Sequence, residues 1–206
     1  GPMPVEACET AGDILGRMHR LAVTELPDTP AFSFDFSVPD QRLGEWLEQA
    51  DVEMQRREQI LQINQTCFDA QPRLMRHAVY GHGDYFPHNL IFDADRKAYV
   101  IDFEMAGLIS PDMELVLASI LFSGRITAGD YSPAPLQAFL HAYRGQAEIR
   151  DERLEDGFWG AISKAWLNWI AYNLAYGDRQ VAMQTIDGML AMLDQKQEVI
   201  ACIRAP

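Results

Sequence analysis

Only one stretch of this 206-residue chain reads as β-structure, and helical segments surround it on both sides. Residues 90–92 and 98–101 are short runs rich in β-branched, aromatic and other apolar residues. The polar residues 93–97 separate the two runs, which predicts a hairpin with a five-residue turn. Because the remainder reads as helix, the sequence predicts an α+β fold, mostly α, with one small β-hairpin.

The helical segments are recognised by apolar residues at helical spacing. Before the hairpin, this pattern covers residues 10–23 and 41–66, and Pro72 is expected to open one further helical turn. Three prolines predict a loop over residues 25–40, since a proline ring disfavours helix before it. After the hairpin, the pattern predicts helices over residues 112–122, 135–143, 154–176 and 179–203.

The charge balance excludes some classes of partner. The chain carries a formal net charge of −13 and has a pI of about 4.7. Non-specific nucleic-acid binding and attraction to an anionic membrane both need a basic surface, so neither partner is expected. No secretion signal opens the chain and the cysteines are scattered, which predicts a cytoplasmic location without disulfides. The three cysteines are Cys8, Cys67 and Cys202.

Two polar motifs stand next to the predicted hairpin. The loop at residues 81–89 contains His82 and Asp84, and Asn89 follows five positions after the aspartate. Asp102 comes directly after the second β-run and precedes an aromatic residue. Protein kinases place a catalytic aspartate and asparagine, and then a metal-binding aspartate, in the same order. Because a hairpin returns the chain beside its starting point, we expect Asp84, Asn89 and Asp102 to lie close together.

These residue types suit the transfer of a phosphoryl group. A carboxylate near the acceptor hydroxyl orients it and takes its proton, and Asp84 is the candidate. Magnesium neutralises charge on the phosphates and prefers hard oxygen ligands, which Asn89 and Asp102 can supply. His82 is expected to hold the loop by packing and hydrogen bonding rather than to react. The sequence assigns no residues to the nucleotide itself.

Residues 82–84, 87–89 and 101–104 resemble the motifs of the aminoglycoside phosphotransferase and choline kinase superfamily, which also contains homoserine kinases. Residues 15–19 resemble the helix that follows the hinge in those enzymes. The resemblance implies the C-terminal lobe of a protein-kinase-like fold. It also implies transfer of the γ-phosphoryl group of ATP, with Mg²⁺, to a hydroxyl of a small acceptor. Asp84 is then the catalytic residue, and Asn89 and Asp102 are the metal ligands.

The resemblance suggests a domain organisation. Residues 1–10 are expected to be an expression scar and a tail, because Gly-Pro precedes the first methionine. Residues 11–206 form the kinase-like lobe, with the catalytic loop at 81–89, the metal-binding hairpin at 90–104 and C-terminal helices over 112–203. Family enzymes also have an N-terminal lobe of strands with a phosphate-binding lysine. This lobe is expected to be absent, since few residues precede position 11 and no glycine-rich phosphate loop occurs.

One further motif departs from the family pattern. Where the family usually has Asp-Pro-x-x-Asp-Leu, residues 110–115 read Ser-Pro-Asp-Met-Glu-Leu. Ser110 and Glu114 therefore stand at the two acidic positions. Glu114 keeps the charge, and we expect the change to alter how the catalytic loop is supported.

The expected absence of a strand lobe leaves several functions open. The chain is a catalytic lobe that is inactive without a strand lobe, a kinase-like remnant that acts as a binding module, or one half of a split kinase. An exposed hinge surface also predicts self-association. The acceptor is not identified by the shared motifs. The aromatic residues at 158–172 are expected in the core, with a pocket for a cationic acceptor as the alternative.

Overall fold

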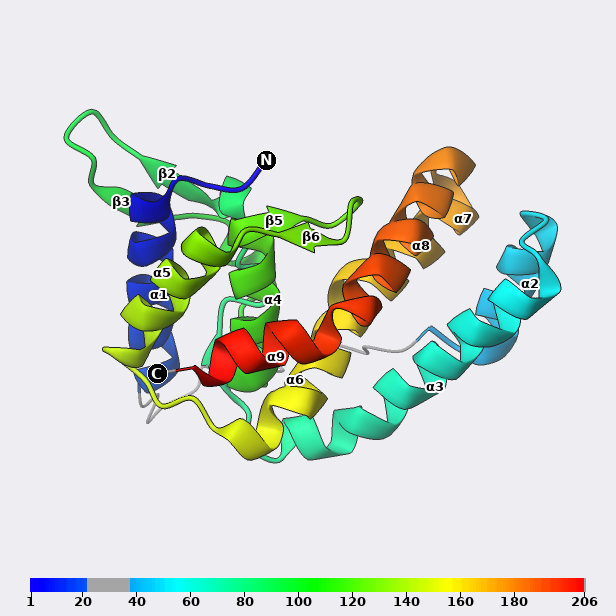
Figure 1. The fold of residues 1–206 in the computed structure, drawn as a ribbon, viewed down its shortest axis with the longest axis horizontal. Helices are drawn as coiled ribbons and strands as arrows, with labels where there is room; N and C mark the ends of the chain where they lie inside the picture. The colour runs from blue at the N-terminus through cyan, green and yellow to red at the C-terminus, as the bar shows by residue number, and fades with distance from the viewer. Residues whose placement is uncertain (22–37, 206) are drawn as a thin grey trace.

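The structure is a computed structural model that describes residues 1–21 and 38–205, and it is built mainly from helices (Figure 1). Most of the loop expected at residues 25–40 lies outside the described residues. No helix within the described ranges is both long enough and apolar enough to cross a membrane. The helices are α1 Val5–Arg20, α2 Asp40–Gln49, α3 Met54–Met75, α4 Pro111–Ser123, α5 Pro133–Arg144, α6 Leu154–Ala161, α7 Asn168–Tyr176, α8 Arg179–Asp194 and α9 Lys196–Arg204.

The strands form three antiparallel pairs. The predicted hairpin is confirmed, because Leu90 pairs with Val100 and Phe92 with Ala98 around the five-residue turn. The other two pairs were not predicted, since strands of two or three residues leave little periodic signal. The pairs are β1 Val79–Gly81 with β4 Gly107–Ile109, β2 Leu90–Phe92 with β3 Ala98–Val100, and β5 Gly124–Arg125 with β6 Asp130–Tyr131.

Short non-α helical turns complete the fold. Two 3₁₀ turns lie in the region of the predicted site, and a π-helical segment joins α6 to α7 without a break. The 3₁₀ turns are η1 Pro87–Asn89, η2 Phe103–Met105 and η3 Asp151–Arg153, and the π-helical segment is η4 Ile162–Leu167. The mostly α fold with a small hairpin beside residues 81–89 agrees with the sequence prediction.

The prediction of one helix over residues 41–66 is wrong. The chain forms α2 and α3 instead, and Asp51 between them has a left-handed backbone with φ 51°. The amide of Val52 donates to the carbonyl oxygen of Leu47 at 3.0 Å, and the amide of Asp51 donates to that of Glu48 at 2.9 Å. This pair of bonds is the Schellman termination of a helix, and it occurs here without glycine. Burial of Val52 holds the turn in place.

Two other predicted boundaries also need correction. Pro72 lies inside the last turns of α3 rather than at the start of a separate turn. Its missing amide leaves the carbonyl of Phe68 without a helical donor, and Phe68 is exposed, so water can satisfy that group. The predicted helix over 179–203 is divided at Gln195, whose side-chain amide donates to the carbonyl oxygen of Gly129 at 2.7 Å.

Helix α4 is the centre of the packing. Nearly all of its residues are buried, and it contacts α1, α5 and α6 (Figure 1). The aromatic side chains Phe122, Phe158 and Trp166 are fully buried, as predicted for the latter two. Tyr85 stacks on Phe122 with 5.4 Å between ring centroids. Since Tyr85 belongs to residues 81–89, this contact anchors the predicted catalytic loop to the core.

Candidate active site

The structure brings Asp84 and Asn89 into direct contact. The Asn89 Nδ2 donates to the backbone oxygen of Asp84 at 2.8 Å and to its Oδ2 at 3.1 Å. Asn89 is 2% exposed, whereas Asp84 is half-buried and lines a cavity. The asparagine therefore fixes the direction of a carboxylate that remains accessible.

His82 connects the loop to the end of the hairpin. Its Nδ1 accepts from the amide of Asp84 at 3.2 Å, and its Nε2 contacts the carbonyl oxygen of Ile101 at 2.9 Å. A backbone amide can only donate and a carbonyl can only accept, so these two contacts fit the tautomer with its proton on Nε2. Its centroid lies 4.5 Å from that of Phe103. These contacts agree with the expected structural role of His82.

Ile101, the residue before Asp102, is hydrogen-bonded to the end of the loop. The amide of Ile101 donates to the carbonyl oxygen of Asn89 at 3.0 Å. Asp102 itself is exposed and has a left-handed backbone with φ 66°, which is uncommon for a residue with a side chain. The hairpin therefore ends with a free carboxylate beside the loop. No direct contact joins Asp102 to Asp84 among the described residues.

The chemistry of these donors fits magnesium. Both hydrogen bonds of the Asn89 side chain use Nδ2, so they leave its Oδ1 as a possible ligand atom. Asp102 adds a carboxylate, and such hard oxygen donors are the ones that Mg²⁺ prefers. Within residues 1–21 and 38–205, no three His, Cys, Asp or Glu side chains group to hold a metal. Asn89 and Asp102 as metal ligands remain a prediction.

A buried chain of side chains supports the loop from the core. Glu114 accepts from the amide of Gly83 through Oε1 at 2.6 Å, and its Oε2 lies 2.9 Å from His19 Nε2. His19 Nδ1 lies 2.8 Å from the Tyr143 hydroxyl. Burial raises the pKa of Tyr143, which keeps that hydroxyl protonated. Glu114, at the position where the family pattern differs, therefore bears directly on the catalytic loop, whereas Ser110 caps α4 by accepting from the amide of Met113.

Gly83 has no room for a side chain. Its φ is +78°, and a Cβ atom there would lie 2.1 Å from the backbone oxygen of Met105. Both conditions require glycine, since other residues rarely adopt this φ and real atoms do not approach so closely. The tight fit lets Glu114 reach the Gly83 amide and sets the direction in which the chain enters Asp84.

Asp84 faces a cavity of about 610 Å³. The catalytic loop forms one wall, the turn after β5 a second, and η4 with α7 a third. The rings of Trp169 and Tyr172 on α7 stack in parallel, 5.5 Å apart with 11° between their planes, and both are about half exposed. The lining residues are Asp84, Phe86, His88, Ile126, Thr127, Lys164, Ala165, Asn168, Trp169 and Tyr172.

Lys164 places a cationic group in the same cavity. It lies in the π-helical segment η4, and such segments often occur at functional sites. Burial lowers its pKa from 10.5 to about 8, and the charges of Asp84 and Glu114 act in the opposite direction. A pKa of about 8 leaves the ammonium mostly charged at neutral pH. The cavity therefore holds one carboxylate and one ammonium beside an aromatic wall.

Several of these residues carry weak sequence signals. Lys164 is 80 residues from Asp84 and appears only as a lysine within an apolar, aromatic stretch. His19 and Glu114 belong to quoted motifs, but their contact joins positions 95 residues apart and has no local pattern. The prediction that Trp169 and Tyr172 lie in the core is wrong, because both rings are about half exposed. Their place in the cavity lining agrees with the alternative, a pocket wall.

Comparison with known proteins identifies a family for most of the chain. Residues 3–155 match the phosphotransferase enzyme family, APH. No curated protein matches the chain. The family match includes the catalytic loop, the hairpin and α4.

Solved structures with the same fold are phosphotransferases and choline or ethanolamine kinases. Spectinomycin phosphotransferase APH(9)-Ia, in complex with ADP and spectinomycin, has a TM-score of 0.59 at 15% identity, covering 100% of this chain and 66% of that one. A choline/ethanolamine kinase family protein from Mesorhizobium loti has a TM-score of 0.58 at 16% identity, covering 99% of this chain and 70% of that one. Choline kinase from Streptococcus pneumoniae has a TM-score of 0.53 at 18% identity, covering 92% of this chain and 66% of that one. The chain thus spans about two thirds of these structures, and the fold is the mostly α lobe of a protein-kinase-like fold.

Proposed function

This chain belongs to the phosphotransferase enzyme family, and from that premise we propose that it transfers the γ-phosphoryl group of ATP to a hydroxyl of a small acceptor. One observation carries the proposal: the Asp84 carboxylate opens into a 610 Å³ cavity while Asn89 fixes its direction. A reactive carboxylate that is both oriented and accessible is what phosphoryl transfer to an alcohol requires.

Asp84 acts as the base in this proposal. It accepts a hydrogen bond from the acceptor hydroxyl and takes the proton as the new oxygen–phosphorus bond forms. The bond between the γ-phosphorus and the bridging oxygen breaks, and ADP leaves with that electron pair. The positive charge of Lys164 in the same cavity offsets negative charge on the transferred group.

Asn89 and Asp102 would hold Mg²⁺ in this proposal. A bound Mg²⁺ supplies positive charge that offsets the charge of the phosphates. His82 holds Ile101, the residue before Asp102, against the catalytic loop. That contact keeps the carboxylate of Asp102 at the edge of the site. The ADP in the complex of spectinomycin phosphotransferase supports a nucleotide donor.

The cavity suits a small alcohol with an apolar or flat face. Trp169 and Tyr172 offer about half of their surface as a stacking wall, and aromatic pairs bind flat or cationic groups on such walls. Lys164 counters Asp84, so the polar end of the cavity is close to neutral. The acceptor is accordingly left open between alcohols with and without an amine.

Labelled ATP tests the proposal. The chain is incubated with γ-labelled ATP, Mg²⁺ and a panel of small alcohols, and label in the alcohol is counted. We expect Asp84→Asn to lower the rate by about 10²–10⁴-fold, the usual contribution of a general base. Asp95→Asn, which changes an exposed carboxylate in the hairpin turn, is the matched control. Equal rates in the two variants would show that Asp84 is not the base.

A second measurement examines the metal without turnover. Binding of Mn²⁺ in the presence of ATP is followed by electron paramagnetic resonance. We expect Asp102→Asn to weaken that binding and Asp95→Asn to leave it unchanged. A wild-type chain that binds Mn²⁺ and ATP but labels no alcohol would favour the binding module, or a lobe that needs a strand lobe, over an enzyme that is active by itself.

A further inference from the structure

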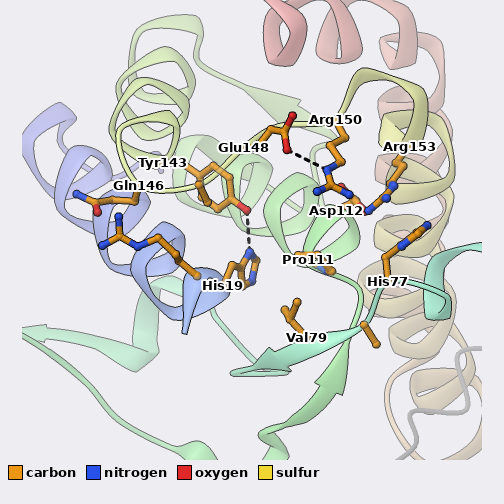
Figure 2. A pocket seen from close by; sticks show the side chains of 13 residues that line it. His19, His77, Val79, Pro111, Asp112, Tyr143, Gln146, Glu148, Arg150 and Arg153 are labelled. Carbon is orange, nitrogen blue, oxygen red and sulfur yellow. Dashed lines mark hydrogen bonds and ion pairs between the residues drawn. The ribbon is translucent and has the colours of Figure 1, made fainter. Parts of the chain in front are cut away.

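A second cavity, of about 430 Å³, lies apart from Asp84 (Figure 2). It is enclosed by the end of α1, the residues before β1, the start of α4 and the loop that follows α5. It shares no lining residue with the cavity at Asp84. The proposed phosphoryl transfer makes no use of it.

Cationic groups gather in this cavity although the chain is acidic as a whole, with a net charge of −13. Three arginines face two acids, Asp112 and Glu148, so the lining has one positive charge in excess before any histidine is protonated. The cationic or potentially cationic lining residues are Arg20, Arg150, Arg153, His19 and His77. This concentration of positive charge favours an anionic ligand.

The arginines keep donors available for such a ligand. Figure 2 shows Arg150 and Arg153 beside Asp112, with His77 on the same side. Arg153 approaches Asp112 at 3.8 Å, which is an ion pair too long for a hydrogen bond. Arg150 uses Nε for an exposed pair with Glu148 at 3.1 Å. Because each guanidinium has five N–H groups, most of them are not used in these two pairs.

Asp112 helps to hold the arginines at this place. It is 6% exposed, and burial raises the pKa of its carboxyl group, while the nearby arginines and histidines lower it. Asp112 thus holds the guanidinium group of Arg153 at the cavity wall, and Arg150 lies beside it (Figure 2). Guanidinium forks match the oxygens of a phosphate group in spacing and geometry.

We propose that this cavity binds a phosphate group, either free phosphate or a small phosphate monoester, between Arg150 and Arg153. Binding of the phosphate group also restrains the catalytic loop. Tyr143 and His19 line the cavity, and they begin the chain of contacts that continues through Glu114 to the amide of Gly83. A ligand that orders Tyr143 restrains this chain, so the Gly83 amide opens less often.

Calorimetry with inorganic phosphate tests the site. We expect binding in the wild-type protein, and Arg150→Gln to weaken it by about tenfold, which is the loss of one charge-assisted contact. Arg57→Gln on α3 is the matched control, because Arg57 also makes one ion pair, to Glu48 at 3.3 Å. Equal affinities in wild type and Arg150→Gln would overturn the site, as would acetate binding more tightly than phosphate. Tighter binding of a phosphate monoester than of phosphate identifies the ester as the ligand.

One variant separates this site from the proposed active site. Lys164→Met removes the cationic group of the other cavity and should leave the phosphate affinity unchanged. Loss of phosphate binding in Lys164→Met would place the ion beside Asp84 and overturn the proposal. The outcome does not depend on any transfer activity, so the failure of one proposal does not decide the other.

Hydrogen exchange tests the connection to the loop. Phosphate should slow exchange of the Gly83 amide in the wild-type protein. In Tyr143→Phe, which keeps the ring and removes the hydroxyl that contacts His19, phosphate should still bind but should not slow that exchange. The same slowing in both proteins, or none in the wild type, would contradict the connection.

Discussion

The catalytic loop has two sides that differ in almost every physical property. On the inner side, Glu114 and His82 are buried, and each accepts a hydrogen bond from a backbone amide of the loop. On the outer side, Trp169 and Tyr172 are half exposed, and Lys164 is a charge held partly out of water. The inner side is thus built for stability, whereas the outer side leaves apolar and charged groups open to a cavity. Substitutions on the inner side should therefore lower the free energy of unfolding. Substitutions on the outer side should change it little or, at Lys164, raise it.

The largest effect is expected at Glu114. Glu114→Ala removes the acceptor of the Gly83 amide and leaves His19 Nε2 buried without a partner. Each buried donor left unsatisfied costs about 1–3 kcal/mol, so the free energy of unfolding should fall by about 2–6 kcal/mol. Denaturant unfolding measures the change. Glu104→Ala, which removes an exposed carboxylate of η2, should change stability by less than about 0.5 kcal/mol. Similar losses in both variants would contradict the supporting role of Glu114.

Gly83→Ala should lower stability by about 1–3 kcal/mol, because the new Cβ meets the Met105 carbonyl at a positive φ. Gly44 in α2 offers a matched control. A Cβ there meets nothing closer than a Leu61 methyl at 3.8 Å. Gly44→Ala should therefore raise stability by about 0.5–1 kcal/mol. Thermal unfolding of the two alanine variants should shift in opposite directions, and two shifts of the same sign would refute the steric argument.

Lys164→Met should raise stability at pH 7, by on the order of 1–2 kcal/mol, since it removes a charge that burial disfavours. In the wild-type chain, Lys164 loses its proton near pH 8, whereas the unfolded chain keeps it to about 10.5. Between about pH 8 and pH 10.5 the unfolded state thus binds more protons than the folded state. The loss of stability caused by the buried charge of Lys164 therefore becomes smaller as pH rises. The stability difference between Lys164→Met and wild type should narrow from pH 8 upward. A constant difference over pH 7–10 would mean that the pKa of Lys164 is not lowered.

The smallest effect on stability is expected on the outer side, at Tyr172. Tyr172→Ala should change the free energy of unfolding by less than about 1 kcal/mol, because the ring is 54% exposed. It should still weaken acceptor binding, which is measured as a higher KM. Tyr176, exposed by 80% and outside the cavity lining, is the control. A large loss of stability in Tyr172→Ala would show that the outer side is also structural.

The sequence predicted the parts of the site that are close together along the chain. Asp84, Asn89 and the hairpin before Asp102 lie within 20 residues, so motif spacing and strand periodicity are sufficient to locate them. The helix break at Asp51 was missed because the left-handed turn uses an aspartate where glycine is usual. Its cause is tertiary, since Val52 is drawn into the core.

The supporting and binding residues were harder to predict. Glu114 meets His19 across 95 positions, and Lys164 meets the Asp84 cavity only because η4 and α7 fold back over the loop. Such pairs depend on the packing of whole helices, which a single sequence does not encode as a local pattern. The roles of Asp84, Asn89 and Asp102 stay predictions until the transfer and metal experiments are done.

The π-helical segment η4 makes one wall of the cavity at Asp84 tolerant of a deletion. A π turn holds about one residue more than an α turn, and each residue of a helix rotates the following face by about 100°. Because the extra residue lies within the π turns, loss of a single codon within residues 162–167 would convert them to α turns and leave Trp169 and Tyr172 facing the cavity. Loss of a codon in α6 would instead rotate α7 by about 100° and turn the two rings away from the cavity.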